Sequence, residues 1–170
     1  KEVMRAPVIL SALLACAACS PPQGEAAKAA SDQHAAAEAE RLNTPPAIPV
    51  DPQPITMADL ERYDLFGVGC YFLDGKGDKA PMLFIGHDDK GWFKLEGEMI
   101  ELSSDRSSTE LPYLSWSKYV GLARTVQLDR NSALARSTGP ETETAPGTII
   151  IRDERDKVVF KRSGAIDCGA

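Results

Sequence analysis

Aromatic residues are confined to one part of this chain, and that distribution limits which part can fold. All 11 aromatic side chains lie between Tyr63 and Phe160, whereas eight of the 12 prolines precede residue 55. A segment without aromatic residues that is rich in Ala, Pro and Gln buries too little apolar surface to offset the entropy lost on ordering. The sequence therefore predicts one folded domain over residues 56–170 and a disordered Ala/Pro-rich tether over residues 20–55.

The predicted tether has two parts of different composition. Residues Gln23 to Arg41 are Ala-rich, which favours transient helix, but they carry no stripe of large apolar residues to pack against a partner. A stable partner helix is the alternative for this part. Residues Asn43 to Pro54 are Pro-rich and should be extended. As a flexible coil the tether would reach about 35 Å.

Short apolar runs separated by turns dominate the predicted domain. A short helix is expected from Thr56 to Tyr63, with Thr56 as its cap and Asp59 supporting the first turn. The strand candidates that follow it are Val68–Leu73, Met82–Ile85, Trp92–Leu95 and Glu98–Leu102. Turns that contain glycine separate them, as in a meander. The predicted class is mainly β: a small antiparallel barrel or sandwich of about six to eight short strands with one short N-terminal helix.

The second half of the domain contains longer candidates and two polar segments. Lys118 to Leu128 alternates with a period of two and is predicted to be one long strand. Thr148–Ile151 and Lys157–Lys161 flank a charged turn and should form a hairpin. Ser103–Leu111 and Asn131–Gly147 have little apolar content, so both are predicted to be loops, the second of them mobile.

Cys70 and Cys168 are the two cysteines of the predicted domain. In an oxidising compartment such a pair is expected to form a disulfide. The entropic model then gives about 4–5 kcal/mol for the closed loop. Two free thiols or a metal pair are the alternatives, but a metal site is disfavoured because His87 is the only histidine of the domain. No metal and no other cofactor is predicted.

No pattern in the domain indicates a catalytic centre. His87 lies in a glycine-flanked turn, and no Gly-x-Ser-x-Gly sequence accompanies it. The segment from Asp74 to Asp78 resembles a turn more than a calcium loop, because Lys76 occupies a ligand position. The carboxylates that would serve a hydrolase are Glu96, Glu98 and Glu101. The net charge of −6 and the absence of a basic stripe argue against nucleic acid as a partner.

Tyr113, Trp116 and Tyr119 form an aromatic cluster beside a polar segment. Such residues fill the core of a small barrel, and they are equally typical of binding surfaces, where Tyr and Trp are enriched. The core is the favoured interpretation. A binding surface formed by these three residues is the alternative.

The N-terminal residues 1–19 resemble a bacterial lipoprotein signal peptide. Met4 is followed by the basic residue Arg5 and by an apolar run from Pro7 to Ala15. That run is too short to span a membrane, which takes about 20 residues, and it suits the core of a cleaved signal. In lipoprotein signals a cysteine follows the cleavage site, and Cys16 and Cys19 both qualify.

The two cysteines fit the lipoprotein pattern in different ways. Leu13, Leu14 and Ala15 precede Cys16 and match the usual spacing of leucine. Cys19 follows small residues and comes directly before a polar segment, so it is the favoured lipidation site. A plain secretory signal cleaved near Ala18 is the alternative. The resemblance implies a lipid anchor on the periplasmic side of a bacterial envelope, at the outer membrane.

The expected function is therefore non-enzymatic: an envelope lipoprotein that binds an envelope protein or a cell-wall component, or that supports envelope integrity. The layout also resembles the membrane-bound inhibitors of c-type lysozyme, which are small lipoproteins with a disulfide-tied β-barrel. Their Ser-Gly-x-x-Tyr motif is not matched, since Ala165, Ile166 and Asp167 follow Ser163 and Gly164. Inhibition of lysozyme is one alternative, and a hydrolase that uses acidic residues is another.

Overall fold

The computed structural model describes residues 23–77 and 79–170 of the chain, which divide into two compact units at Pro45. The first unit contains helix α1, Gln23–Asn43, whose described side chains are almost all exposed and none of which is buried. A local ion pair between Arg41 and Glu38, with a nitrogen–oxygen distance of 2.6 Å, supports its last turns. A helix without buried residues depends on propensity and local pairs alone, so the disordered tether remains a prediction.

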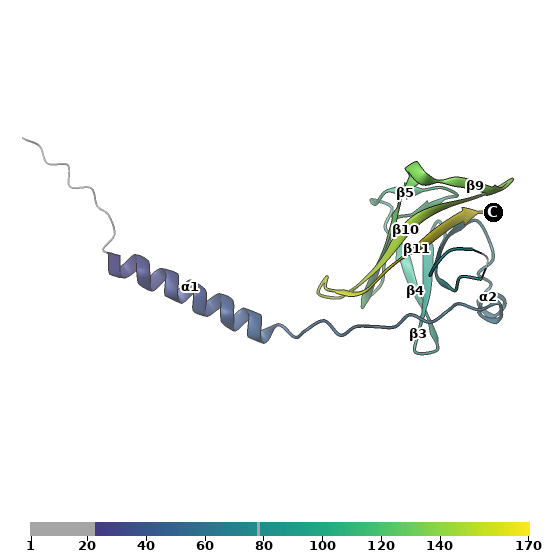
Figure 1. The fold of residues 1–170 in the computed structure, drawn as a ribbon. Coiled ribbons are helices and arrows are strands. Elements are labelled where there is room, and N and C mark those ends of the chain that lie inside the picture. The colour runs from purple at the N-terminus through teal and green to yellow at the C-terminus, as the bar shows by residue number, and fades with distance from the viewer. Residues whose placement is uncertain (1–22, 78) are drawn as a thin grey trace, which may run out of the picture. The chain divides into compact units, whose positions relative to one another are not determined.

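The second unit, Pro46–Ala170, is a closed antiparallel β-barrel (Figure 1). Eight strands pair in the order β11-β1-β2-β3-β4-β7-β8-β10, and β10 closes the barrel by pairing with β11. Their bounds are β1 Gly69–Leu73, β2 Met82–Gly86, β3 Lys90–Leu95, β4 Glu98–Ser104, β7 Lys118–Val120, β8 Arg124–Arg130, β10 Thr142–Asp153 and β11 Val158–Gly169. The predicted mainly β class, with a small antiparallel barrel as one of its two forms, is confirmed.

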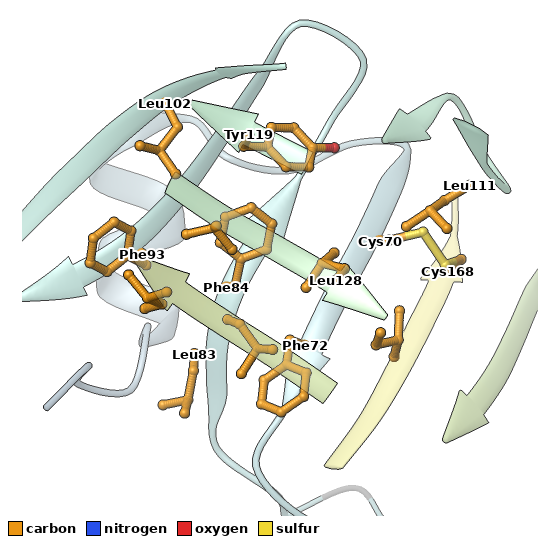
Figure 2. Packing of buried hydrophobic residues seen from close by; sticks show 14 of the residues in the cluster. Cys70, Phe72, Leu83, Phe84, Phe93, Leu102, Leu111, Tyr119, Leu128 and Cys168 are labelled. Carbon is orange, nitrogen blue, oxygen red and sulfur yellow. A yellow bond between two sulfur atoms is a disulfide. The ribbon is translucent and has the colours of Figure 1, made fainter. Parts of the chain in front are cut away.

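Alternate side chains of these strands point inward and form the core (Figure 2). Phe72, Phe84 and Phe93 come from three neighbouring strands and are fully buried. Tyr119 lies beside them with no exposed surface, and its ring centroid is 5.2 Å from that of Phe84. Bulky side chains therefore fill the interior of the barrel.

Two segments cover opposite ends of the barrel. At the end formed by Leu95, the segment 46–55 crosses the strands: Val50 N–H donates to the Val159 carbonyl over 3.1 Å, and Gln53 pairs with Lys94. At the end formed by Gly86 lies a small hairpin of β5, Glu110–Leu111, and β6, Ser115–Trp116. The compact unit thus begins at Pro46, before the predicted start at residue 56, because the Pro-rich segment packs on the barrel.

Helix α2, Met57–Tyr63, covers part of the outer face of the barrel. Its N-terminus has the predicted cap: the Asp59 N–H donates to Thr56 Oγ1, and the Thr56 N–H donates to the Asp59 carboxylate over 2.9 Å. Lys94 Nζ on β3 donates to the same carboxylate, also over 2.9 Å. A second apolar cluster, of Ile55, Leu65 and Ile85, lies under this helix and its flanks.

The prediction of one long strand from Lys118 to Leu128 is wrong. The chain reverses there, and β7 and β8 form a hairpin in which the Gly121 N–H donates to the Arg124 carbonyl over 2.8 Å. Leu122 lies at the tip of this turn and is fully exposed. The apparent period of two did not mark one face of a strand. Val120 and Leu122 are exposed whereas Val126 and Leu128 are buried, and Tyr119 is the residue of β7 that faces the core opposite Val126.

The prediction of a mobile loop over Asn131–Gly147 is also wrong. This stretch forms a short 3-10 helix η1, Ser132–Leu134, then β9, Arg136–Gly139, and the first half of β10. Its β-branched threonines suit strands although it lacks large apolar residues. β9 pairs with β10 in antiparallel register, with Arg136 opposite Thr144.

We predict that Asp59 stabilises the barrel at neutral pH and that this contribution is lost at low pH. The hydrogen bond from Lys94, followed by those from the Thr56 backbone and hydroxyl, lowers the pKa of Asp59 to about 2. A carboxylate with a depressed pKa stabilises the folded state above its unfolded pKa of about 3.9, and that contribution is lost as pH falls toward the folded value. Asp59→Asn should therefore lower the unfolding free energy at neutral pH by about 1 kcal/mol.

The measurement is urea unfolding of wild type and variant between pH 7 and about pH 2. The gap between the two proteins should shrink as the pH falls through this range. Asp51→Asn, at an exposed position of the segment 46–55, is the matched control and should change stability little. A gap that stays constant with pH would contradict the assignment.

Candidate functional site

A large hollow lies outside the barrel, on the outward face of β1, β11, β10 and β9. It has a volume of about 820 Å³. η1 and β9 border it on one side, and the loop after β1, with Lys76 and Gly77, borders it on the other. We call it the outer groove. Strands β9, β10 and β11, which form its floor and one wall, lie side by side in Figure 1.

The outer groove exists because strand pairing changes halfway along β10. Residues from Gly147 onward pair with β8, whereas Thr142, Glu143 and Thr144 pair with β9. At the changeover Gly147 stands opposite Gly164 of β11. A side chain at Gly164 would collide with the Leu73 carbonyl, so this close approach of β11 to the end of β1 requires glycine.

Directly opposed residues carry their side chains on the same face, so the register aligns them in rows across the outer groove. One row is polar and crosses four strands: Tyr71 on β1, Asp167 on β11, Thr144 on β10 and Arg136 on β9. The neighbouring row is apolar and crosses three: Leu73, Ala165 and Pro146. The outer groove thus presents an apolar strip beside a strip of mixed hydrogen-bonding groups.

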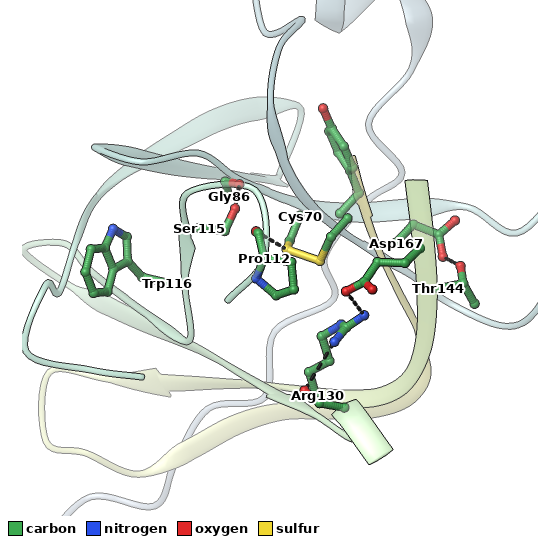
Figure 3. The surroundings of a disulfide bond; sticks show 12 residues. Cys70, Gly86, Pro112, Ser115, Trp116, Arg130, Thr144 and Asp167 are labelled. Atoms are coloured by element: carbon green, nitrogen blue, oxygen red, sulfur yellow. Dashed lines mark hydrogen bonds and ion pairs between the residues drawn. A yellow bond between two sulfur atoms is a disulfide. The ribbon is translucent and has the colours of Figure 1, made fainter. Parts of the chain in front are cut away.

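Three members of the polar row are held by hydrogen bonds within the chain. The Thr144 hydroxyl donates to an Asp167 carboxylate oxygen, as Figure 3 shows. The Tyr71 hydroxyl donates to the Gly67 carbonyl over 2.5 Å, and burial raises the pKa of this phenol. These bonds fix the side chains in place before any ligand arrives.

Two cations border the outer groove without a partner. Among the described residues, Arg136 and Lys76 make no hydrogen bond or ion pair. Two other arginines of the barrel are paired: Arg130 Nη2 lies 2.6 Å from the Glu143 carboxylate, and Arg162 Nη1 lies 3.2 Å from that of Asp74. The positive charges of Arg136 and Lys76 are therefore available to an anion.

A second hollow of about 440 Å³ continues the outer groove along the same face. It shares Lys76, Pro146 and Gly164 with the first hollow. Its remaining polar lining includes hydroxyl, carboxylate and amide side chains, namely Thr148, Ser163, Asp129 and Asn131. The two hollows together form an elongated depression with Lys76 at their junction.

The predicted disulfide between Cys70 and Cys168 is present, and it ties together two strands of the groove floor (Figure 3). The two residues are direct cross-strand partners on β1 and β11. Their side chains face inward, where Cys70 Sγ lies 3.4 Å from the Pro112 carbonyl oxygen of the β5–β6 hairpin. Cys168 also contributes to the lining of the outer groove.

The predicted aromatic cluster lies away from the outer groove. Tyr119 belongs to the core, and its hydroxyl donates to the His87 carbonyl over 2.9 Å. Trp116 is half-buried, and its indole N–H donates to the Asp88 carbonyl over 3.0 Å. Tyr113 is half-buried and packs against the core from the β5–β6 hairpin. For Tyr119 the structure therefore supports the core interpretation.

The residues considered for catalysis are dispersed. His87 packs edge-on against Trp92, with ring centroids 5.3 Å apart, and burial lowers the pKa of its imidazole. Glu101 pairs with Lys90 on the neighbouring strand over 2.9 Å. None of Glu96, Glu98 or Glu101 lines the two hollows described above. Cys16 and Cys19 lie outside the described residues.

Within residues 23–77 and 79–170, no cluster of three or more His, Cys, Asp or Glu side chains is placed to hold a metal ion. No helix of the same residues is long and apolar enough to cross a membrane. Comparison with protein-family models, with curated proteins and with solved structures finds no match.

We predict that the Cys70–Cys168 bond contributes strongly to stability. The double variant Cys70→Ala/Cys168→Ala should lose about 2–5 kcal/mol of unfolding free energy in guanidinium, because the bond closes a loop of 98 sequence positions. Val126→Ala, which truncates a buried core residue without touching the bond, calibrates the measurement. A double variant as stable as wild type would contradict the prediction.

Proposed function

We propose that this protein is a non-enzymatic binding protein of the bacterial cell envelope and that the outer groove is its binding site. The observation that carries the proposal is the pair of unpartnered cations, Arg136 and Lys76, beside a groove built on paired strands. Concave sites with an apolar lining and a few convergent polar groups are where small ligands and chain segments bind. A barrel interior filled by core side chains leaves this outer face as the place for a ligand.

The groove is rigid enough to bind without reorganising. Its floor consists of β1, β11 and β10, which pair over most of their length. The Cys70–Cys168 disulfide and the Thr144–Asp167 hydrogen bond further restrict this floor. A preorganised site loses less conformational entropy on binding, so more of the contact energy remains as affinity.

Binding is favoured over hydrolysis by the disposition of the carboxylates. Acid hydrolysis of a glycoside uses two carboxyl groups about 5–10 Å apart on either side of the scissile bond. Asp167 lines the first hollow and accepts the Thr144 hydroxyl, whereas Asp129 lines the second and accepts Gln127 Nε2 over 2.6 Å. Each of the two carboxylates thus holds a neighbouring side chain in place, which is a positioning role that a binding site also requires.

The cellular location rests on the N-terminal residues. A signal that resembles those of bacterial lipoproteins, with Cys19 or Cys16 as the lipidated residue, would attach the chain to the periplasmic side of the outer membrane. The part of the predicted tether that precedes the compact unit, residues 20–45, would then allow the barrel to reach envelope proteins or the cell wall. The partners we propose are the membrane, through the lipid, and one of these envelope components.

The lipid attachment is tested by mass spectrometry of the mature protein expressed in a bacterial host. We expect an N-terminus at Cys19 that carries a diacylglyceryl thioether, and Cys19→Ala should abolish it whereas Cys16→Ala should not. A mature chain that begins at Cys16 would reassign the site. An unmodified N-terminus would refute the anchor.

The binding site is tested by filling the groove. Thr138→Trp on β9 places a bulky side chain in the groove lining. In the protein expressed without residues 1–19, so that no lipid attaches it to the membrane, this change should abolish retention on isolated bacterial envelopes. Val158→Trp, at an exposed strand position outside the two hollows, is the matched control and should leave retention unchanged. Both variants should unfold at the same denaturant concentration as wild type.

Equal retention of Thr138→Trp and wild type would show that the outer groove is not the site. Lysis of cell walls by a c-type lysozyme, measured with and without the protein, decides the inhibitor alternative in the same preparation. Unaltered lysis removes that alternative. Turnover of an envelope substrate by the purified protein would replace binding by enzymatic activity.

A further inference from the structure

We infer that the outer groove binds a linear glycan that carries carboxylate groups, the chemistry of an acidic amino-sugar chain of the cell wall. This inference rests on the proposed function and names the class of ligand for that same site. Three properties of the lining carry it: many short hydroxyl side chains, an apolar strip beside them, and the two unpartnered cations.

Hydroxyl groups are the most frequent polar groups of the elongated depression. The side chains that supply them are Thr138, Thr142, Thr144, Thr148 and Ser163. Each hydroxyl both donates and accepts, and Asn131 adds an amide with the same capacity. Sugar hydroxyl and acetamido groups also combine donors with acceptors, so such a lining can match them along a chain.

The apolar row provides the complementary contact. Leu73, Ala165 and Pro146 form a strip next to the polar row, and the half-buried Tyr71 ring lies at its edge. A pyranose ring has C–H groups on its faces and hydroxyl groups around its rim. A surface with an apolar strip between polar groups therefore fits a sugar ring better than it fits a purely apolar chain.

The two unpaired cations favour an acidic glycan over a neutral one. Asp167 and Asp129 are also charged and accept hydrogen bonds from the neutral groups of Thr144 and Gln127. Arg136 and Lys76 make no hydrogen bond or ion pair among the described residues, so a ligand carboxylate would bind at these two cations. A guanidinium binds a carboxylate through two parallel hydrogen bonds, and an ammonium attracts it as a point charge. A ligand with carboxylates spaced along its length can use both cations.

The elongated depression is long enough to hold more than one sugar unit. The first hollow alone has about 820 Å³, which is within the range of sites that hold drug-sized ligands. The polar row crosses four strands, so Tyr71 and Arg136 are separated by about 14 Å at strand spacings of about 4.8 Å. The second hollow extends the site past Lys76.

An extended peptide is the competing occupant. It could pair with the free edge of β9, the last strand in the sheet order, but it would then lie beside that strand and use backbone groups. Binding at the edge would not require the two cations or the hydroxyl row. We therefore favour the glycan and treat the peptide as an outcome of the test.

The test is isothermal titration of the full mature protein, purified in detergent, with two soluble tetrasaccharides. One alternates N-acetylglucosamine and N-acetylmuramic acid without peptides and carries carboxylates. The other contains N-acetylglucosamine only and is neutral. We expect the acidic tetrasaccharide to bind at least about tenfold more tightly, because only it can pair with the two cations.

Variants assign the difference to the groove. Arg136→Gln and Lys76→Gln should each weaken binding of the acidic tetrasaccharide by about tenfold and leave that of the neutral one unchanged. Arg155→Gln, at the exposed β10–β11 turn, removes the same charge elsewhere and should change neither affinity. An equal loss with Arg155→Gln would mean a general charge effect and would overturn the inference.

The titration and the envelope-retention assay together distinguish failure of the glycan inference from failure of the proposed function. If neither tetrasaccharide binds while envelope retention is still lost in Thr138→Trp, the groove binds another ligand, such as a peptide, and only the glycan inference fails. Equal affinity for the two tetrasaccharides likewise overturns it. If envelope retention does not depend on Thr138, both proposals fail.

Discussion

The long β10–β11 hairpin forms part of the barrel and part of the outer groove. The rest of the structure depends on which residues of β10 pair with β8 and which pair with β9. β11 pairs with β10 along nearly its whole length, but the other edge of β10 pairs first with β9 and then with β8. The half that pairs with β8 closes the barrel around its core. The half that pairs with β9 leaves the barrel wall and forms the floor and one wall of the groove.

The bend in this hairpin is set by residue size and by buried charge. Gly147 and Gly164 stand opposite each other, and side chains there would collide with Ile166 and with the Leu73 carbonyl, respectively. Just beyond the bend the Arg130 side chain, which is only 1% exposed, pairs with Glu143 on the first half of β10. Loss of one partner would leave a buried charge uncompensated, so the pair holds that half in place.

The Cys70–Cys168 disulfide restrains the same part of β11 by joining it to β1. Cys168 is opposite Glu143 on β10 and opposite Cys70 on β1, so one row across three strands contains both the ion pair and the covalent bond. The groove floor is therefore fixed from beneath by inward-facing groups, while its outward-facing groups remain available. This division of the two faces follows from the alternation of side chains along a strand.

The sequence predicted the barrel better than it predicted the groove, for a physical reason. Strands β1 to β4 contain short runs rich in apolar residues, and glycines lie in or directly beside the turns that separate β1, β2 and β3 from the strands that follow them. The capping box of Thr56 and Asp59 is a local signal. The groove wall contains small and polar residues because it faces solvent. Thr142 and Thr144 indicated a strand, since threonine favours strands. Arg136 is identified as a groove residue only through the strand register, which places it opposite Thr144.

Solution NMR would test the central claim, that the outer groove is where this protein meets its ligand. Backbone amide shifts of the isotopically labelled protein would be followed while a soluble fraction of cell-wall glycan is added. The account predicts that the largest changes occur at groove residues such as Lys76, Arg136 and Thr144, with little change at the β5–β6 hairpin. Changes centred on Tyr113 and Trp116, with the groove residues unaffected, would contradict it.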